Sequence, residues 1–299
     1  MNAIKERLLG MRSGLKHAAA ILALFAPCAF GAIDKGVPAL KVTAPNGAAS
    51  IIVGSAHVGV NGVREPDATI FAGARRLVVE HRGDVQPGDV GDVAGSTLAV
   101  WAQDLTAPEI AVYLHRARCA GVPPDGALPL LMRPSVQWAN QLAYTVCGWG
   151  TVPSRDTVLN EEKPMGLATD YLEDDAWVEA KRRSVPSSLS NTSFKWALAH
   201  NPAEIWKRIR DAINKGDYES VRDEFDASVG SVENAKQLDQ IMVDERNAAW
   251  IPRLRRYLDD GDAVIVVGAM HLPGDSGLIQ RLRKSGYSVD AIILPAKAD

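Results

Sequence analysis

Two segments near opposite ends of the chain share one pattern, and this pattern limits the folds that the sequence can adopt. Each is a run of apolar residues followed by Gly-x-x-His: residues 51–57 end in His57, and residues 265–271 end in His271. Runs of β-branched residues favour buried strands, and glycine lets the chain turn sharply or another group approach closely. Two such strands in one sheet would bring two imidazole rings to the same region.

The other strand patterns also lie at the two ends of the chain. Strands are expected over residues 37–43, 51–57, 77–81, 262–267 and 287–294. The region between them, about 100–258, is mainly helical by its apolar spacing. We therefore predict an α/β (α+β) fold, in which residues 32–299 form a single domain. Its central mixed β-sheet is formed by both chain ends and is flanked by the helical middle region.

Capping signals place several of the helices. Thr106 with Glu109 three residues later is typical of a capping box, and Asn201 before Pro202 is a second helix start. Helical spacing is also expected over 67–76, and a long helical pattern covers 231–259 with an interruption near Pro252. The Ser- and Asn-rich stretch 185–195 is expected to be a loop.

The first 31 residues have the features of a secretory signal peptide. A basic start precedes an apolar run of nine residues, 18–26, and small residues follow at Ala29 and Gly31. Nine helical residues reach about 14 Å, well short of the roughly 30 Å core of a bilayer. A short buried helix is the alternative, and Pro27 disfavours a lipoprotein signal ending at Cys28. We expect an exported protein, periplasmic or secreted.

Export makes the two remaining cysteines informative. Cys119 and Cys147 stay in the chain after the signal peptide is removed. In an oxidising compartment they favour one disulfide, which could stabilise the fold by about 3–4 kcal/mol. Two buried free thiols are the alternative.

Composition excludes several classes of protein. Hydrophobic residues make up 46% and charged residues 23% of the chain, which rules out a disordered chain. The formal net charge is −3, so no basic excess points to nucleic acid. Beyond the signal peptide no stretch is apolar enough to span a membrane, so no membrane partner is expected after its removal, and the oligomeric state stays open.

A third ionisable group ends another apolar strand. Glu80 follows Leu77-Val-Val, and a carboxylate in that position needs a partner or a metal ion, because burying it alone costs several kcal/mol. The plainer interpretation is a salt bridge to Arg82 or another neighbour. In a regular strand His81 would face the opposite side from Glu80.

Four motifs follow one another along the chain: Gly54-Ser-Ala-His57, Val79-Glu80, Asp244-Glu-Arg-Asn247 and Gly268-Ala-Met-His271-Leu-Pro-Gly274. In this order they resemble the motifs of the TraB/GumN family, which includes the Tiki metalloproteases. The resemblance implies a divalent metal ion held by His57, Glu80 and His271. It favours Mn²⁺ or Co²⁺, and imidazole with carboxylate also suits Zn²⁺ or Fe²⁺.

The same resemblance suggests roles in catalysis. Arg246 or Asn247 could stabilise a developing oxyanion, or the two could form a structural bridge between helix and loop, and Glu80 could act as general base instead of ligand. One position departs from the family, because Ala168 stands where glutamate is expected. Asp170 or Glu173 could substitute for this glutamate, although neither stands at the matching position.

Three functions follow from these residues. The first is an exported metal-dependent hydrolase, most plausibly a peptidase, acting on a peptide or another small extracytoplasmic substrate. The second, motivated by Ala168, is a non-catalytic periplasmic binding or accessory protein on the same scaffold. The third is an iron oxygenase with a two-His-one-carboxylate site, which the sequence supports least because it lacks a jelly-roll strand pattern. The absence of HExxH excludes a zincin-type site.

Overall fold

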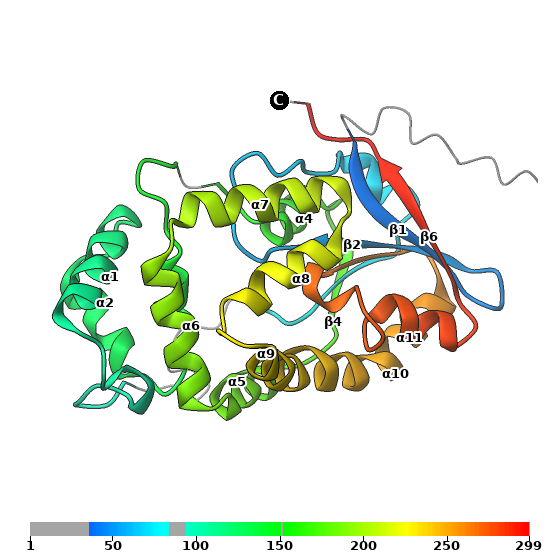
Figure 1. The fold of residues 1–299 in the computed structure, drawn as a ribbon. Coiled ribbons are helices and arrows are strands. Elements are labelled where there is room, and N and C mark those ends of the chain that lie inside the picture. Colours follow the sequence, from blue (N-terminus) through cyan, green and yellow to red (C-terminus); the bar gives the residue numbers. More distant parts are fainter. Residues whose placement is uncertain (1–35, 84–93, 151, 299) are drawn as a thin grey trace, which may run out of the picture. The chain divides into compact units, whose positions relative to one another are not determined.

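Six strands form one mixed sheet (Figure 1), and their spatial order is β4-β3-β5-β2-β1-β6. The strands are β1 Val37–Thr43, β2 Ala49–Ser55, β3 Arg76–Val79, β4 Ala168–Tyr171, β5 Ala263–Gly268 and β6 Ser288–Leu294. The computed structural model describes residues 36–83, 94–150 and 152–298. The expected signal peptide, residues 1–31, lies outside these ranges.

The sheet confirms the prediction that both chain ends build it. Strands β4, β3, β5 and β2 run parallel to one another, with Val53 of β2 opposite Val266 of β5. Strand β1 pairs antiparallel with β2 and with β6. The sequence analysis missed β4, which comes from the middle of the chain. As a result, the carboxyl ends of four neighbouring parallel strands lie along one edge of the sheet.

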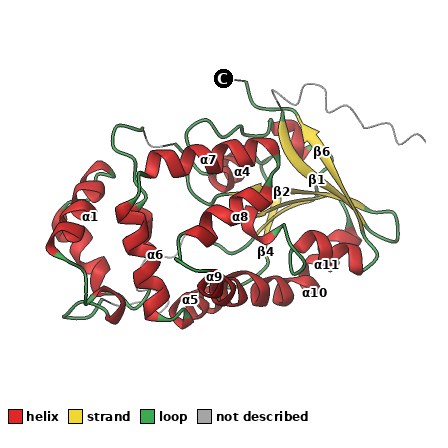
Figure 2. Cartoon of the chain, in the orientation of Figure 1, coloured by secondary structure: helices red, strands yellow, loops and turns green. Residues whose placement is uncertain are grey.

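Helices fill most of the remaining chain (Figure 2). They are α1 Ala107–Cys119, α2 Pro124–Ala127, α3 Gln137–Ala143, α4 Arg155–Glu162, α5 Asp175–Ser184, α6 Ser187–Ala199, α7 Pro202–Lys215, α8 Tyr218–Ala227, α9 Val232–Asp239, α10 Glu245–Asp260 and α11 Leu278–Lys284. The predicted capping box of Thr106 and Glu109 is confirmed at the start of α1. The predicted cap at Asn201, whose side chain accepts from the Ala203 amide, begins α7.

Three local predictions are wrong. Residues 185–195 were expected to be a loop, but most of them lie in α6, whose apolar side Leu189, Phe194, Ala197 and Leu198 is buried. Residues 67–76 form only a short 3₁₀ turn, Ala68–Phe71, before β3 begins. The helical region 231–259 is interrupted by a π-helical segment, Gln240–Asp244, whereas Pro252 lies inside α10.

Both faces of the sheet are covered, as its strands' apolar residues require. On one face Ile52, Val78 and Ile265 pack with buried residues of α7, α8, α10 and α11. On the other face Val53 and Val266 pack with the Ala68–Phe71 turn and with α4. A further apolar cluster joins α1, α3 and α6, and Figure 1 shows α1 and α2 beyond α6, away from the sheet.

The predicted disulfide is confirmed in this helical part. Cys119 at the end of α1 is bonded to Cys147, which follows α3. The bridge therefore ties two helices of the α1, α3 and α6 cluster together.

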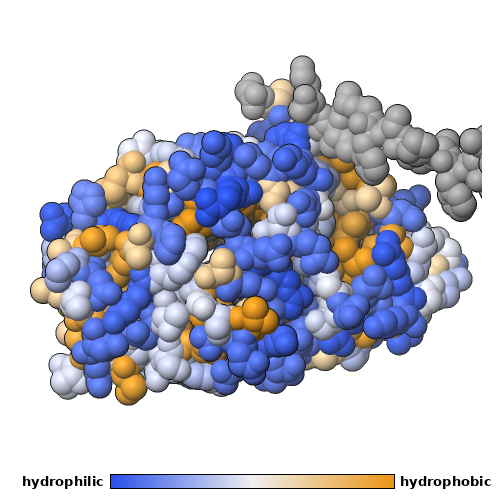
Figure 3. Space-filling view, viewed as in Figure 1, coloured by the Kyte–Doolittle hydropathy of each residue, from blue (hydrophilic) through white to orange (hydrophobic). Residues whose placement is uncertain are grey.

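The outer surface shows no large apolar area on the face seen in Figure 3, where hydrophobic residues form small patches among hydrophilic ones. Exposed large apolar side chains such as Val100, Met165 and Val232 are far apart in the sequence. Isolated apolar side chains are normal on a protein surface. Of the described residues, none forms a helix with the length and apolar character of a membrane span.

One buried cation holds the ends of two of these helices. Arg116 of α1 donates to the carbonyl oxygens of Ala143, Ala197, Leu198 and His200 at 2.5–3.2 Å. These carbonyls belong to the carboxyl ends of α3 and α6, where no further turn supplies a donor.

Arg116→Met should therefore lower the free energy of unfolding by about 3 kcal/mol or more, because four carbonyls lose a charged donor. Urea denaturation measures the change. Arg118→Met, at an exposed position on the same helix, is the matched control and should change stability by less than about 0.5 kcal/mol. Equal free energies of unfolding for the two variants would contradict this stabilising role of Arg116.

Candidate functional site

The edge where the parallel strands end carries the candidate site. His57 follows β2, Glu80 follows β3, Glu173 follows β4, and His271 ends the short 3₁₀ turn after β5. Ligands bind to α/β sheets at this edge, because the loops that leave the strands surround a crevice there. A cavity of about 1160 Å³ lies here, bounded by the strand ends on one side and by α3, α6 and α8 on the other.

Glu80 is the centre of the site. Its Oε1 accepts the Gly268 amide at 2.6 Å and lies 3.1 Å from His57 Nε2 and 3.8 Å from His271 Nε2. A β-carbon at Gly268 would lie 2.7 Å from His57 Nε2 and 3.2 Å from Glu80 Oε1. A side chain at position 268 would therefore prevent these groups from meeting, which explains the glycine of the second Gly-x-x-His motif.

His57 is held in an unusual backbone conformation. Its φ of 59° lies in the left-handed region, which is uncommon for a residue other than glycine and often marks a functional position. The Ser55 hydroxyl accepts the His57 amide, and Asp156 of α4 contacts His57 Nδ1 at 3.2 Å. Ser55 also donates to Asp156. Together these contacts direct Nε2 of the ring toward Glu80.

The charges around His57 raise its pKa. Burial among protein atoms lowers the pKa, but the carboxylates of Glu80 and Asp156 outweigh it and hold the value well above the ordinary one. The ring still presents 42% of its surface to solvent because it faces the cavity. For Glu80 the directions are reversed. Burial raises the pKa of this carboxyl group, but the charges of His57 and Arg246 outweigh it and hold the pKa well below its ordinary value.

His271 has the opposite character. Asn247 Nδ2 donates to the carbonyls of His271 and Ser276, so its Oδ1 faces His271 Nδ1 at 2.8 Å. Because Oδ1 can only accept, Nδ1 carries the proton, and the lone pair of Nε2 accepts a hydrogen bond from Arg246 Nη1 at 3.1 Å. Burial lowers the pKa of His271 to about 3, so the ring is neutral at physiological pH. Both N–H groups of Asn247 are engaged, so its role is to orient His271, and the oxyanion role suggested by the sequence does not fit.

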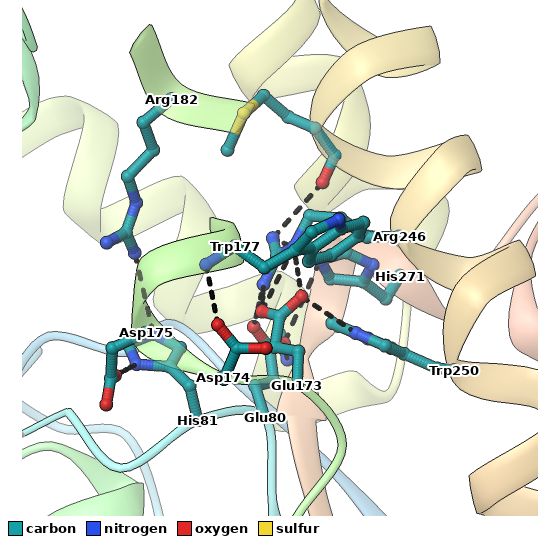
Figure 4. A network of polar contacts seen from close by, with 12 residues as sticks. Glu80, His81, Glu173, Asp174, Asp175, Trp177, Arg182, Arg246, Trp250 and His271 are labelled. Carbon is teal, nitrogen blue, oxygen red and sulfur yellow. Dashed lines mark hydrogen bonds and ion pairs between the residues drawn. The ribbon is translucent and has the colours of Figure 1, made fainter. Parts of the chain in front are cut away.

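Arg246 links the two acidic residues. Its guanidinium donates to Glu80 Oε2 at 2.6 Å and to both carboxylate oxygens of Glu173, and its Nη1 lies 3.1 Å from His271 Nε2 (Figure 4). Trp250 also donates to Glu173. The partner of Glu80 is therefore Arg246, and not Arg82. The π-helical segment Gln240–Asp244 directly precedes Glu245 and Arg246, and such segments often occur at functional sites.

Glu173 places a buried carboxylate in the cluster, whereas position 168 lies outside it. Ala168 is exposed at the start of β4, whereas Glu173 is buried beyond the end of β4, beside Glu80. The Glu173 amide donates to the Glu80 carbonyl, which fixes the two strand ends side by side. The sequence analysis considered Glu173 only as a substitute for the glutamate absent at position 168, and it missed Asp156. Their only signal was an acidic residue next to a motif, which is common on protein surfaces.

The donor atoms of His57, Glu80 and His271 suit a divalent ion. Each imidazole has an oxygen next to Nδ1, from Asp156 or Asn247, and such contacts orient histidine ligands so that Nε2 meets the metal. Glu80 Oε1 is close to both rings, but the two Nε2 atoms must approach each other to share one ion.

One group of three ligand-type side chains within 4.8 Å of one another is found in the described part of the chain. It consists of His115, Cys119 and Cys147. The two sulfurs of this group are joined in the disulfide, so they are not thiolate ligands.

Comparison with known proteins gives one match. A model of the TraB/PrgY/gumN family matches residues 154–291, which include Glu173, Arg246, Asn247 and His271. No curated protein and no solved structure matches the chain.

The two histidines should be distinguishable in solution. In the metal-free protein, ¹⁵N NMR of the imidazole rings should show His271 neutral and protonated at Nδ1 between about pH 5 and pH 8. Asn247→Ala is the matched variant, and it should release this preference for one tautomer. Below about pH 6.5 an unfolded histidine binds a proton that folded His271 refuses, so this group lowers the stability as the pH falls toward 3. A charged His271 ring at pH 6 would contradict this assignment.

Proposed function

The chain belongs to the TraB/PrgY/gumN family, and from this premise we propose that it is an exported metal-dependent hydrolase that cleaves peptides. The observation that carries the proposal is the approach of His57 Nε2 and His271 Nε2 to one oxygen of Glu80, at the edge of the parallel strands. The cavity of about 1160 Å³ supports a substrate larger than a single small molecule. No nucleic acid or membrane takes part in this function.

His57, Glu80 and His271 would hold the ion, with Mn²⁺ or Co²⁺ favoured over Zn²⁺ or Fe²⁺. A bound divalent ion polarises a carbonyl group and lowers the pKa of bound water. Arg246 Nη1 donates to the Met242 carbonyl and contacts His271 Nε2, so a change at His271 frees that N–H for a substrate oxygen. Glu80 and Glu173 keep the guanidinium in place during such a change.

The alternative of a non-catalytic binding or accessory protein loses its main motivation. It was based on Ala168, but Glu173 places a carboxylate in the cluster from a different position. A protein that binds peptides and ions without cleaving peptides is therefore an outcome of the test and not a second proposal.

Metal binding and peptide cleavage test the function together. The full chain should bind Mn²⁺ in a calorimetric titration and cleave members of a peptide library, and a chelator should stop the cleavage. His271→Ala and Glu80→Gln should each weaken Mn²⁺ binding by roughly 100-fold or more and abolish cleavage, because each removes a ligand. Ala168→Glu is the control, and it should leave both unchanged because position 168 is exposed at the far end of β4.

Two results would count against the proposal. Cleavage that persists undiminished in chelator would exclude metal dependence. Peptide binding without any cleavage, in the presence of each of the four ions, would favour the accessory protein.

We also propose that residues 1–31 are removed on export. The basic start and the apolar run at 18–26 support this, and so does the Cys119–Cys147 disulfide, because disulfides persist in oxidising compartments. When the full chain is expressed in a bacterium, N-terminal sequencing of the extracytoplasmic fraction should begin at Ala32. Protein that retains Met1 and stays in the cytoplasm would refute the cleavage.

A further inference from the structure

A second arginine lines the cavity apart from the cluster around Glu80. Arg182 lies on α5, and its side chain ends beside His81 (Figure 4), with no hydrogen bond to the cluster around Glu80 among the described residues. Its side chain is 19% exposed. Arg182 is therefore a cation in the wall of the same cavity, and the hydrolytic site described above does not use it.

The contacts of Arg182 are few and long. Within the described residues, Nη2 lies 3.5 Å from His81 Nε2, and Nη1 lies 3.6 Å from Glu179 Oε2. By contrast, Arg116, Arg155 and Arg246 each donate at least three hydrogen bonds of 3.2 Å or less. A guanidinium has five N–H groups, so the two long contacts leave donors that a ligand in the cavity can use.

His81 is held in place beside Arg182. Its Nδ1 contacts Asp175 Oδ1 at 2.8 Å, and Asp175 Oδ1 also accepts the Gly83 amide. A guanidinium can only donate, so His81 Nε2 is the acceptor in the contact with Arg182. His81 therefore offers the guanidinium a partner that carries no negative charge.

We propose that Arg182 binds a carboxylate group of the substrate. A guanidinium pairs with a carboxylate through two parallel hydrogen bonds, and this pairing is stronger than one between neutral groups. The Glu179 carboxylate lies 3.6 Å from Arg182 Nη1, so one negative charge is already close, and a singly charged group is favoured over a doubly charged phosphate. The inference rests on the proposed function only for the peptidic nature of the substrate.

The electrostatic surroundings agree with this assignment. Burial and the nearby charge of Arg246 lower the pKa of Arg182, so its cationic form is less stable there than in water. An anion bound in the cavity would stabilise the cation. Arg182 thus differs from Arg246, whose pKa is raised because Glu80 and Glu173 outweigh its burial.

The carboxylate can belong to the carboxyl terminus of a peptide or to an Asp or Glu side chain, and the experiment separates these sources. A library of N-acetylated pentapeptides is made once with free carboxyl termini and once with terminal amides. Each set is prepared with and without Asp and Glu. Binding to the full chain is measured at equilibrium, and mass spectrometry quantifies each bound peptide that is still intact.

The full chain should bind peptides that carry a carboxylate with an affinity roughly 10-fold or more higher than that for peptides without one. This is the gain in affinity expected from a hydrogen bond between charged groups. Arg182→Gln should remove this preference while the binding of peptides without a carboxylate stays unchanged. Arg182→Lys should keep part of the preference, because it retains the charge but loses the two-bond geometry. Arg183→Gln is the matched control, since Arg183 is not among the described residues that line the cavity.

Three results would overturn the inference: equal binding of all four peptide sets to the full chain, absence of peptide binding, or an equal loss for all four sets in Arg182→Gln. The last would show a structural role, and the melting temperature of the variant would fall with it. Failure of hydrolysis is a separate result. If no peptide is cleaved but the Arg182-dependent preference for a carboxylate remains, the proposed function fails and the carboxylate subsite stands.

Discussion

The buried Arg246 guanidinium, held between Glu80 and Glu173, is the interaction on which the site depends. It connects the ends of β3 and β4 to the start of α10, three elements far apart in the sequence. Charges buried in this way are costly, and removing one partner of such a pair typically destabilises a protein by about 3–5 kcal/mol. The cluster is therefore poor evidence for extra stability and better evidence for a constraint on position. The cation between them orients both carboxylates, and with His57 it outweighs burial and holds the pKa of Glu80 well below its ordinary value.

The parallel part of the sheet explains why these groups meet at all. Strands β3, β5 and β2 are neighbours and point the same way, so their last residues must lie together. This could be predicted from the sequence, because each strand is an apolar run with a polar residue at its end. Glu173 could not be predicted in the same way. Its strand β4 has the sequence Ala-Thr-Asp-Tyr, which lacks an apolar run and gains its strand conformation from pairing with β3.

The errors in the helical region have a similar origin. The Ser- and Asn-rich segment 185–195 has weak helix propensity, but α6 is stabilised by burial of Phe194 and Leu198 against α1 and α3. Tertiary packing therefore decided its structure. The π-helical segment before Arg246 leaves no signal in the apolar spacing, because that spacing describes the average turn of a helix and not one inserted residue. Local patterns therefore predicted the elements with a strong pattern of their own and missed those that depend on tertiary contacts.

The two Gly-x-x-His motifs, alike in sequence, place their histidines in different electrostatic surroundings. Two carboxylates contact His57, because Glu80 Oε1 lies 3.1 Å from Nε2 and Asp156 Oδ1 lies 3.2 Å from Nδ1. Burial lowers the pKa of His57, but Glu80 and then Asp156 outweigh it and raise the value. For His271, Glu80 Oε1 lies farther away, at 3.8 Å, and the Nδ1 partner is the neutral amide of Asn247, so burial lowers the pKa to about 3. In the proposed site, His271 is already neutral and must exchange the Arg246 N–H for the ion, whereas His57 must first lose a proton. Ion binding is thereby linked to pH through His57, and the carboxylates that set this link are Glu80 and Asp156, the latter on a helix outside both motifs.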